Sequence, residues 1–354
     1  MNHAVIMAGG IGSRFWPLSR KKKPKQVLNI FGGNTLLQDA VTRISPLIPA
    51  SEILIVTTRG LLDQVRQQLP DLGEGNFLVE PVGRNTAPCI GLAAIKLKKR
   101  DPDGIMVVLP ADHLIPDHDR FTACLSQAIE TVKLDDSLVT IGITPTQPET
   151  GYGYIQYDSE RKLASGAYAV RTFAEKPTLC TAERFLASGD FLWNSGIFIW
   201  SIRRILSEIE LSLPELFAAL CEIEELTGPD RETQFEHIYS GLRAISIDYG
   251  VMERAQNVAV VRGDFSWSDI GNWAEVYRLS PKDGDGNVNI DGHILIDTRN
   301  CMIDSRDRLV ATVGVENLIV INTEDALLIC HRDAAQDVKR IVDYMERNQR
   351  DKYL

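Results

Sequence analysis

Short apolar runs alternate with segments of helical periodicity through the first 143 residues, and this alternation limits the folds open to the chain. Strands are expected at 3–8, 52–57, 77–80, 105–109 and 138–143, and helices at 35–44, 61–69, 86–100 and 121–132. Repeated strand–helix–strand units are typical of an α/β fold. We therefore predict a Rossmann-like mixed, mostly parallel sheet flanked by helices, whose ligands bind beyond the carboxyl ends of the strands.

The pattern becomes mixed from residue 150 but does not start a new domain. Further strands are expected at 152–157, 168–173, 196–200 and 258–262, with a helix at 202–210. These segments should extend the same sheet, so we predict one large α/β domain over residues 1–282.

After Pro281 the sequence consists mainly of short apolar runs typical of β-strands. The runs HILI, CMI, LVATV, LIVI and ALLIC are separated by turn clusters, which favours a small β-roll or left-handed β-helix. The segment 333–348 places Val338, Ile341, Val342 and Met345 at helical spacing. We predict a second domain over 283–354 that ends in an amphipathic helix and serves packing or assembly, including a homo-oligomer, rather than chemistry.

Composition excludes several partners. Lys and Arg number 38 against 48 Asp and Glu, a net charge of −10, and such a chain is repelled by a nucleic-acid backbone. We expect no nucleic acid and no membrane, because no apolar run reaches the ~18 residues of a membrane span. The six cysteines are scattered without a CxxC, so we expect reduced thiols and a cytoplasmic location.

A glycine loop follows the first strand as AGGIGSRFWP. Gly9, Gly10, Gly12 and Ser13 allow backbone amides to approach an anion closely. The loop is neither a GxGxxG fingerprint, since Phe15 replaces the third glycine, nor a Walker A motif. A plain tight turn is the alternative, but basic residues follow within a dozen positions, namely Arg14, Arg20, Lys21, Lys22, Lys23 and Lys25.

Two acidic residues follow apolar strands and are candidates for ligand contact. Asp112 comes after IMVVLP and Glu80 ends the run FLVE, both at carboxyl ends of parallel strands. A turn or capping aspartate is the alternative for Asp112, and an exposed strand-end acid is the alternative for Glu80.

Several motif blocks together resemble one known family. AGGIGSRFWPLSR, PKQ, EPVGRNTAP, PADH, TGYGYI, FAEKP, WNSGIF, IDYGVMER and WSDIGNW occur in order over nearly the whole chain. The sequence resembles the sugar-phosphate nucleotidyltransferases, and most closely their mannose-1-phosphate guanylyltransferase (GDP-mannose pyrophosphorylase) branch. Val27 and Gly250 depart from the usual pattern without touching the chemistry. The chain lacks the additional isomerase domain of some relatives, so we expect no phosphomannose isomerase activity.

The resemblance implies a reaction and its machinery. GTP and mannose 1-phosphate would give GDP-mannose and pyrophosphate, by in-line attack of the sugar phosphate on the α-phosphorus. Arg14 and Lys25 would hold the triphosphate and stabilise the leaving pyrophosphate. Asp112 and Asp269 would hold one Mg²⁺ together with phosphate oxygens. His113 is not assigned to the metal, because Mg²⁺ prefers oxygen ligands.

The resemblance also implies substrate-binding residues. Besides the loop residues Gly9, Gly10, Gly12 and Ser13, Glu80 and Asn85 would read the guanine edge. The sugar phosphate would contact Gly151, Glu175, Lys176 and Asn194. Two alternatives stay open: a nucleotidyltransferase for another base or hexose 1-phosphate, and a catalytically inactive regulatory protein that binds GDP-mannose.

Overall fold

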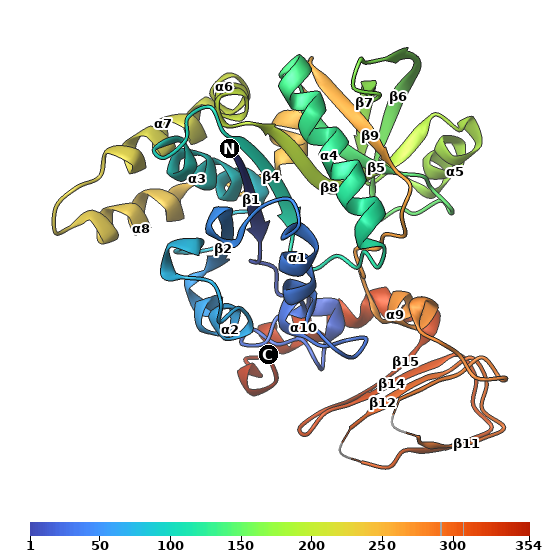
Figure 1. The fold of residues 1–354 in the computed structure, drawn as a ribbon. Coiled ribbons are helices and arrows are strands. Elements are labelled where there is room, and N and C mark those ends of the chain that lie inside the picture. Colours follow the sequence, from blue (N-terminus) through green and yellow to red (C-terminus); the bar gives the residue numbers. More distant parts are fainter. Residues whose placement is uncertain (291, 307) are drawn as a thin grey trace.

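A computed structural model describes residues 1–290, 292–306 and 308–354. Its centre is a nine-stranded sheet in the order β3-β2-β1-β4-β8-β5-β9-β7-β6 (Figure 1). The first four strands are parallel neighbours, as expected from the strand–helix alternation. They are β1 (Asn2–Met7), β2 (Ile53–Thr58), β3 (Phe77–Glu80) and β4 (Ile105–Pro110).

The other half of the sheet corrects the expectation of mostly parallel pairing. β8 (Phe191–Ser201) lies between β4 and β5 (Leu138–Ile143) and is antiparallel to both. β9 (Val258–Gly263) is parallel to β5. β6 (Gly153–Lys162) and β7 (Tyr168–Glu175) form an antiparallel hairpin at the far edge. Segments after residue 150 therefore extend the first sheet, but largely through antiparallel pairing.

Helices cover both faces of the sheet (Figure 1). One buried cluster includes α1 (Leu36–Ile44), α2 (Leu62–Gln68) and α4 (His118–Asp135). The opposite cluster includes α3 (Thr86–Lys98), α6 (Ile202–Ser212), α7 (Pro214–Glu225) and α8 (Arg231–Gly241). α4 is longer than the expected 121–132, because Asp117 caps it upstream of the first apolar residue. α5 (Leu179–Ser188) and α9 (Trp273–Leu279) are further helices.

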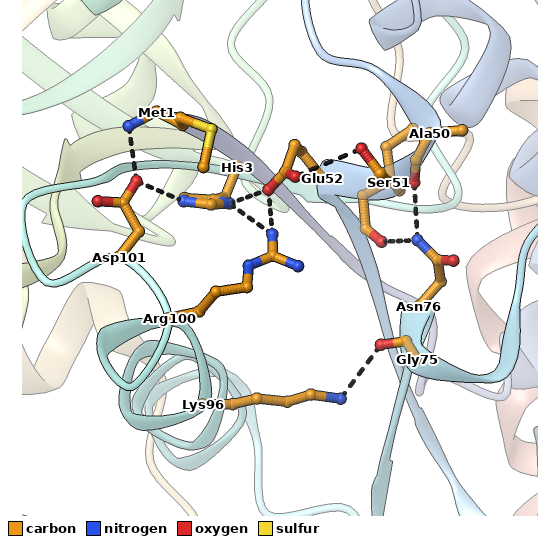
Figure 2. A network of polar contacts seen from close by, with 11 residues as sticks. Met1, His3, Ala50, Ser51, Glu52, Gly75, Asn76, Lys96, Arg100 and Asp101 are labelled. Carbon is orange, nitrogen blue, oxygen red and sulfur yellow. Dashed lines mark hydrogen bonds and ion pairs between the residues drawn. The ribbon is translucent and has the colours of Figure 1, made fainter.

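A polar network ties the start of β1 to its neighbours (Figure 2). The His3 ring is fully buried, with Nε2 at 3.0 Å from Asp101 Oδ2 and Nδ1 at 2.8 Å from Glu52 Oε2. The Met1 ammonium also reaches Asp101, and Arg100 donates to Glu52. Hydrogen bonds from the Met1 ammonium and His3 lower the pKa of Asp101. The network lies at the amino end of β1, opposite the edge where ligands collect in α/β sheets.

The C-terminal region is a stack of short coils. β10 (Val288–Ile290), β12 (Met302–Ser305) and β14 (Leu318–Asn322) pair in parallel, and so do β11 (Ile294–Ile296) and β13 (Ala311–Val313). Ser305 of β12 and Asn322 of β14 occupy equivalent positions on successive coils and are 17 residues apart. This is β-helix architecture, and β15 (Leu327–His331) closes it by pairing antiparallel to β14.

The terminal helix packs against the large domain. The expected helix 333–348 begins as a 3-10 segment, Arg332–Asp337, before α10 (Val338–Arg347). Val338 and Met345 are buried in one cluster with Phe15 and Trp16 of the segment after β1. In Figure 1, α10 accordingly lies beside the blue N-terminal segments. Across the described residues, no helix is long and apolar enough to cross a membrane.

Candidate active site

The glycine loop after β1 requires glycine at one position for two reasons. Gly12 has a φ of 72°, and a Cβ there would lie 2.5 Å from the Cβ of Lys25, far closer than real side chains approach. The loop thus folds back onto the PKQ segment, and the Lys25 amide donates to the Ile11 carbonyl at 3.2 Å. Gly9, Gly10 and Ser13 lie on the same loop, Arg14 is exposed, and Phe15 is buried.

Lys25 joins three segments that are distant in the sequence. Its side chain is only 6 % exposed, and its Nζ donates to Asp112 Oδ2 at 2.9 Å. The same ammonium donates to the backbone carbonyl of Asp269, and it lies 5.6 Å from the centre of the Phe15 ring. The segments that follow β1, β4 and β9 therefore meet at one buried cation.

The two aspartates around Lys25 have opposite electrostatic environments. Burial opposes ionisation of Asp112, but the nearby Lys25 ammonium, His113 and local hydrogen bonds together outweigh burial, and the pKa of Asp112 is lowered. Burial raises the pKa of Asp269, whose Oδ1 accepts a hydrogen bond from the Tyr152 hydroxyl at 2.9 Å. When both aspartates are ionised, their two carboxylates and the one Lys25 ammonium together carry a net negative charge.

This donor set fits a divalent cation of the hard, oxygen-preferring kind. Within the described ranges there is no cluster of three or more His, Cys, Asp or Glu side chains that could hold a metal. A metal held here would take the carboxylates of Asp112 and Asp269 as its side-chain ligands, and phosphate oxygens and water at its remaining positions. That division is typical of Mg²⁺ sites in phosphoryl-transfer proteins.

Glu80 lies beside the glycine loop rather than in solvent. It is 4 % exposed, and a Cβ on Gly9 would lie 3.7 Å from its Oε2. The Tyr239 hydroxyl donates to its Oε1 at 2.5 Å. Burial, partly offset by the hydrogen bond from Tyr239, raises the pKa of Glu80 to about 7. The exposed-acid alternative for Glu80 is therefore wrong.

Asn85 is exposed at the start of α3 and has a local structural role. Its φ of 68° is unusual for a side-chain-bearing residue. Its Oδ1 accepts a hydrogen bond from the Thr86 amide at 2.8 Å and so caps the helix. That bond uses the side-chain oxygen and leaves the amide nitrogen to donate elsewhere.

A second polar cluster gathers the residues expected to contact the sugar phosphate. Glu175 ends β7, and Gly153 of β6 separates it from Asn194 of β8, so the three strands bring these side chains together. The exposed Lys176 ammonium lies 3.7 Å from Glu175 Oε1. Asn194 donates to Asp248 Oδ1 at 2.7 Å. Burial, and then the nearby Asp248 carboxylate, raise the pKa of Glu175.

Gly151 is less available than expected, because its amide already donates to Glu149 Oε1 at 2.9 Å. Its neighbour Tyr152 links the two polar clusters. The Tyr152 ring packs against Trp193 and Trp267, with ring centres 5.2 Å and 5.1 Å away, while its hydroxyl holds Asp269.

Three residues of the site were not singled out from the sequence. Tyr152 and Asp248 lie within the TGYGYI and IDYGVMER blocks, so those motifs contained the signal. Tyr239 lies in no block and is found only through its contact with Glu80. His113, which was not assigned to a metal, accepts a hydrogen bond from Trp267 Nε1 at 3.2 Å, and burial lowers its pKa to about 4.

Comparison with known proteins shows which family the chain belongs to. The model of the family "Nucleotidyl transferase" matches residues 3–286, and that of the "MannoseP isomerase/GMP-like beta-helix domain" matches 291–345. The chain belongs to the nucleotidyl transferase family. The resemblance drawn from the motif blocks is thereby confirmed.

Individual relatives agree with this assignment. A mannose-1-phosphate guanylyltransferase of Escherichia coli is 41% identical over 99% of this chain and 75% of its own length. One of Klebsiella pneumoniae is also 41% identical, with the same coverage. A crystal structure from Thermus thermophilus, described as a mannose-1-phosphate geranyltransferase, has 34% identity and a TM-score of 0.88, covering 98% of this chain and 99% of that one.

Proposed function

We propose that this enzyme transfers GMP from GTP to mannose 1-phosphate, giving GDP-mannose and pyrophosphate. The observation that carries the proposal is the junction at Lys25, where the glycine loop and two aspartate-bearing segments meet. The similarity to mannose-1-phosphate guanylyltransferases over nearly the full chain supports the choice of base and sugar.

The protein's own groups would act by positioning and electrostatics. A sugar-phosphate oxygen attacks the α-phosphorus in line with the departing pyrophosphate, and no covalent enzyme intermediate is required. Arg14 is exposed on the glycine loop, where its guanidinium can bind phosphate oxygens in a bidentate manner. Lys25 is fixed beneath the same loop and contributes a buried positive charge that stabilises the developing negative charge.

Asp112 and Asp269 would hold the divalent metal, and we propose Mg²⁺. When bound between these carboxylates, Mg²⁺ would screen the repulsion between nucleotide and sugar phosphates and would stabilise charge on the leaving group. Lys25 keeps Asp112 ionised and therefore ready to bind a cation. Tyr152 orients Asp269 through its hydroxyl.

Glu80 and Asn85 would contact the guanine edge, with Gly9, Gly10, Gly12 and Ser13 holding the nucleotide through their backbone. Glu80 accepts from N1–H and N2–H only when it is ionised, which requires a pH near or above its pKa of about 7. Glu175, Asn194 and the backbone at Gly151 would contact the mannose hydroxyls. Lys176, exposed and preceding Pro177, would bind the sugar phosphate.

A substrate panel tests this function and its alternatives. GTP, ATP, UTP and dTTP are each combined with mannose 1-phosphate and glucose 1-phosphate, and pyrophosphate release and nucleotide sugar are measured. The highest kcat/KM is expected for GTP with mannose 1-phosphate. Equal turnover of dTTP with glucose 1-phosphate contradicts the assignment. GDP-mannose binding without turnover of any pair identifies an inactive regulatory protein.

Three further features stay proposals. We place the boundary between the catalytic domain and the small C-terminal domain near residue 283. Self-association would use the outer faces of the β-helix, where Ile294, Ile296 and Val313 are exposed, and light scattering of the purified protein tests it. A cytoplasmic location suits the six cysteines, all of which are free thiols.

A further inference from the structure

The last turn of the described chain contacts the segment that follows the glycine loop. The backbone carbonyl of Tyr353 accepts a hydrogen bond from Trp16 Nε1 at 2.9 Å and another from Arg20 Nη1 at 2.5 Å. The donors and the acceptor are more than 330 positions apart in the sequence. One carbonyl oxygen thus joins segments from opposite ends of the sequence.

Other contacts hold the same residues in place. Arg20 also donates to the Pro17 carbonyl at 2.6 Å and to Asp325 Oδ1 at 2.8 Å, and its side chain is only 15 % exposed. Its guanidinium lies 5.6 Å from the centre of the Trp16 ring. Lys21 forms an ion pair at 3.3 Å with Glu346 of α10, although both side chains are half exposed, and such a pair contributes little energy.

Trp16 connects these contacts to the proposed catalytic groups. Its own carbonyl accepts a hydrogen bond from Trp273 Nε1 at 3.1 Å, so the residue is fixed on both its backbone and its indole. The preceding residue, Phe15, packs on Trp273 and lies next to the Lys25 ammonium. Arg14 comes directly before Phe15. A shift of Trp16 would therefore move Phe15 and Arg14, and with them the part of the glycine loop proposed to bind phosphate.

We propose that the C-terminal turn 351–354 positions the glycine loop, and that it does so through the Tyr353 carbonyl, which holds Trp16 and Arg20. These are positioning residues, because none of them needs to touch substrate. The inference rests on the proposed function in one respect, namely that the Arg14 and Lys25 region holds the nucleoside triphosphate. It goes beyond that function by giving the C-terminal domain a part in the reaction.

The test compares two changes made from opposite sides of the contact. One variant ends at Arg350 and lacks the carbonyl, and the other, Trp16→Phe, lacks the indole N–H but keeps an aromatic ring. Each should lower kcat/KM for GTP by about tenfold, which equals about 1.4 kcal/mol. The KM for mannose 1-phosphate should not change, because Glu175 and Lys176 lie in the other polar cluster.

Controls separate positioning from a general loss of stability. Tyr353→Phe removes only the hydroxyl and keeps both the carbonyl and the ring that packs on the buried cluster of Phe15 and Trp16, so its kcat/KM should stay near that of the unmodified enzyme. Tyr344→Ala changes a residue of α10 that is 57% exposed and should have no effect. Rates are measured well below the melting temperature of each variant, so that loss of folded protein does not contribute.

Combining the truncation with Trp16→Phe makes the decisive comparison. If both act through one carbonyl, the double variant loses no more than the worse single variant, whereas independent effects multiply. Multiplied effects, or unchanged kcat/KM with only a lower melting temperature, overturn the proposal. If the truncated chain does not fold, the comparison of Trp16→Phe with Tyr353→Phe still tests the proposal, because only Trp16→Phe removes a donor to the Tyr353 carbonyl. If another nucleotide proves to be the substrate, the proposed function fails but the positioning proposal can still be tested. The kcat/KM values of the single and double variants are then compared with that nucleotide.

Discussion

The ammonium of Lys25 lies 2.9 Å from one carboxylate oxygen of Asp112, and this contact pairs a buried cation with an acid at the end of β4. Lys25→Met should remove the cation while keeping an apolar stem beside Gly12. We expect kcat for guanylyl transfer to fall by about 10²-fold, equal to about 2.7 kcal/mol of transition-state stabilisation. Lys25→Arg is the matched control and should retain part of the rate. A Met variant within threefold of the unmodified enzyme would show that Lys25 has no part in the chemistry.

Asp112→Asn and Asp269→Asn should both abolish most of the activity, because each removes a proposed metal ligand. A loss of about 10³-fold corresponds to about 4 kcal/mol. Initial rates are measured over a Mg²⁺ titration. Near-normal rates at ordinary Mg²⁺ in either variant would exclude that aspartate from the metal site.

The same two variants should differ in stability without ligands. The pKa of Asp112 is lowered, so its ionised form stabilises the fold above its unfolded pKa, and this contribution is lost as pH falls through the folded value. The pKa of Asp269 is raised, so its contribution is lost as pH rises through the folded value. At pH 7, Asp112→Asn should lower the melting temperature, and Asp269→Asn should leave it unchanged or raise it. The opposite order contradicts this electrostatic assignment.

Glu80→Gln should relax base preference and alter the pH dependence of stability. The Gln side chain can still accept from Tyr239 but presents only one acceptor, so discrimination of GTP from ATP should fall by a factor that reflects ~1 to 3 kcal/mol. Because the pKa of Glu80 is raised to about 7, the unmodified protein loses stability between about pH 4.5 and 7 as this group ionises. The variant should lack that loss. Unchanged base discrimination would exclude Glu80 as the base-reading residue.

Lys176→Met should raise the KM for mannose 1-phosphate by about tenfold, equal to about 1.4 kcal/mol, and leave the KM for GTP unchanged. The reason is that Lys176 is exposed beside Glu175, in the cluster assigned to the sugar phosphate. Lys339→Met serves as the control, because Lys339 is also an exposed lysine but lies on α10, away from this cluster. Equal rises in both KM values would point to a general electrostatic effect.

Asp101→Asn should weaken the network at the start of β1 without touching activity. The pKa of Asp101 is lowered by its hydrogen bonds, so its stabilising effect is present above the unfolded pKa and is lost as pH falls through the folded value. The variant should therefore be less stable than the unmodified protein at pH 7, and the difference should shrink in acid. Thermal melts at pH 7 and at about pH 2, well below the ordinary aspartate pKa of 3.8, measure it.

Much of the fold could be predicted because buried parallel strands carry a strong local signal. β1, β2 and β4 each contain a continuous apolar run, at 4–7, 53–56 and 105–110. Such runs are expected for strands covered by helices on both faces, and the alternating helices complete the pattern. β8 was predicted to start at residue 196 and instead begins at Phe191. Its first half contains Asn194 and Ser195, whose polar groups bond to Asp248 and to the Ile141 carbonyl. Such distant partners leave no trace in local periodicity.

Some residues of the candidate site could likewise be predicted from the sequence, and others could not. The loop glycines, Lys25 and Asp112 could be chosen from residue type and from their positions in the sequence. Asp269 was implied by the motif blocks that identified the family. Tyr239 could not be found, because it lies 159 positions from Glu80 and belongs to no block. The contact of Tyr353 with Trp16 also depends on how the β-helix domain packs against the first domain.

The sequence by itself determined which groups are available for chemistry and near which strand ends they lie. Tertiary structure alone decided how those groups ionise. Asp112 and Asp269 are the same residue type, yet the pKa of one is lowered and that of the other is raised. Burial opposes ionisation of both carboxylates. At Asp112 the Lys25 ammonium, His113 and hydrogen bonds together outweigh burial, whereas at Asp269 burial prevails, and Lys25 donates only to its backbone carbonyl. Such a difference arises only when three distant segments are packed together.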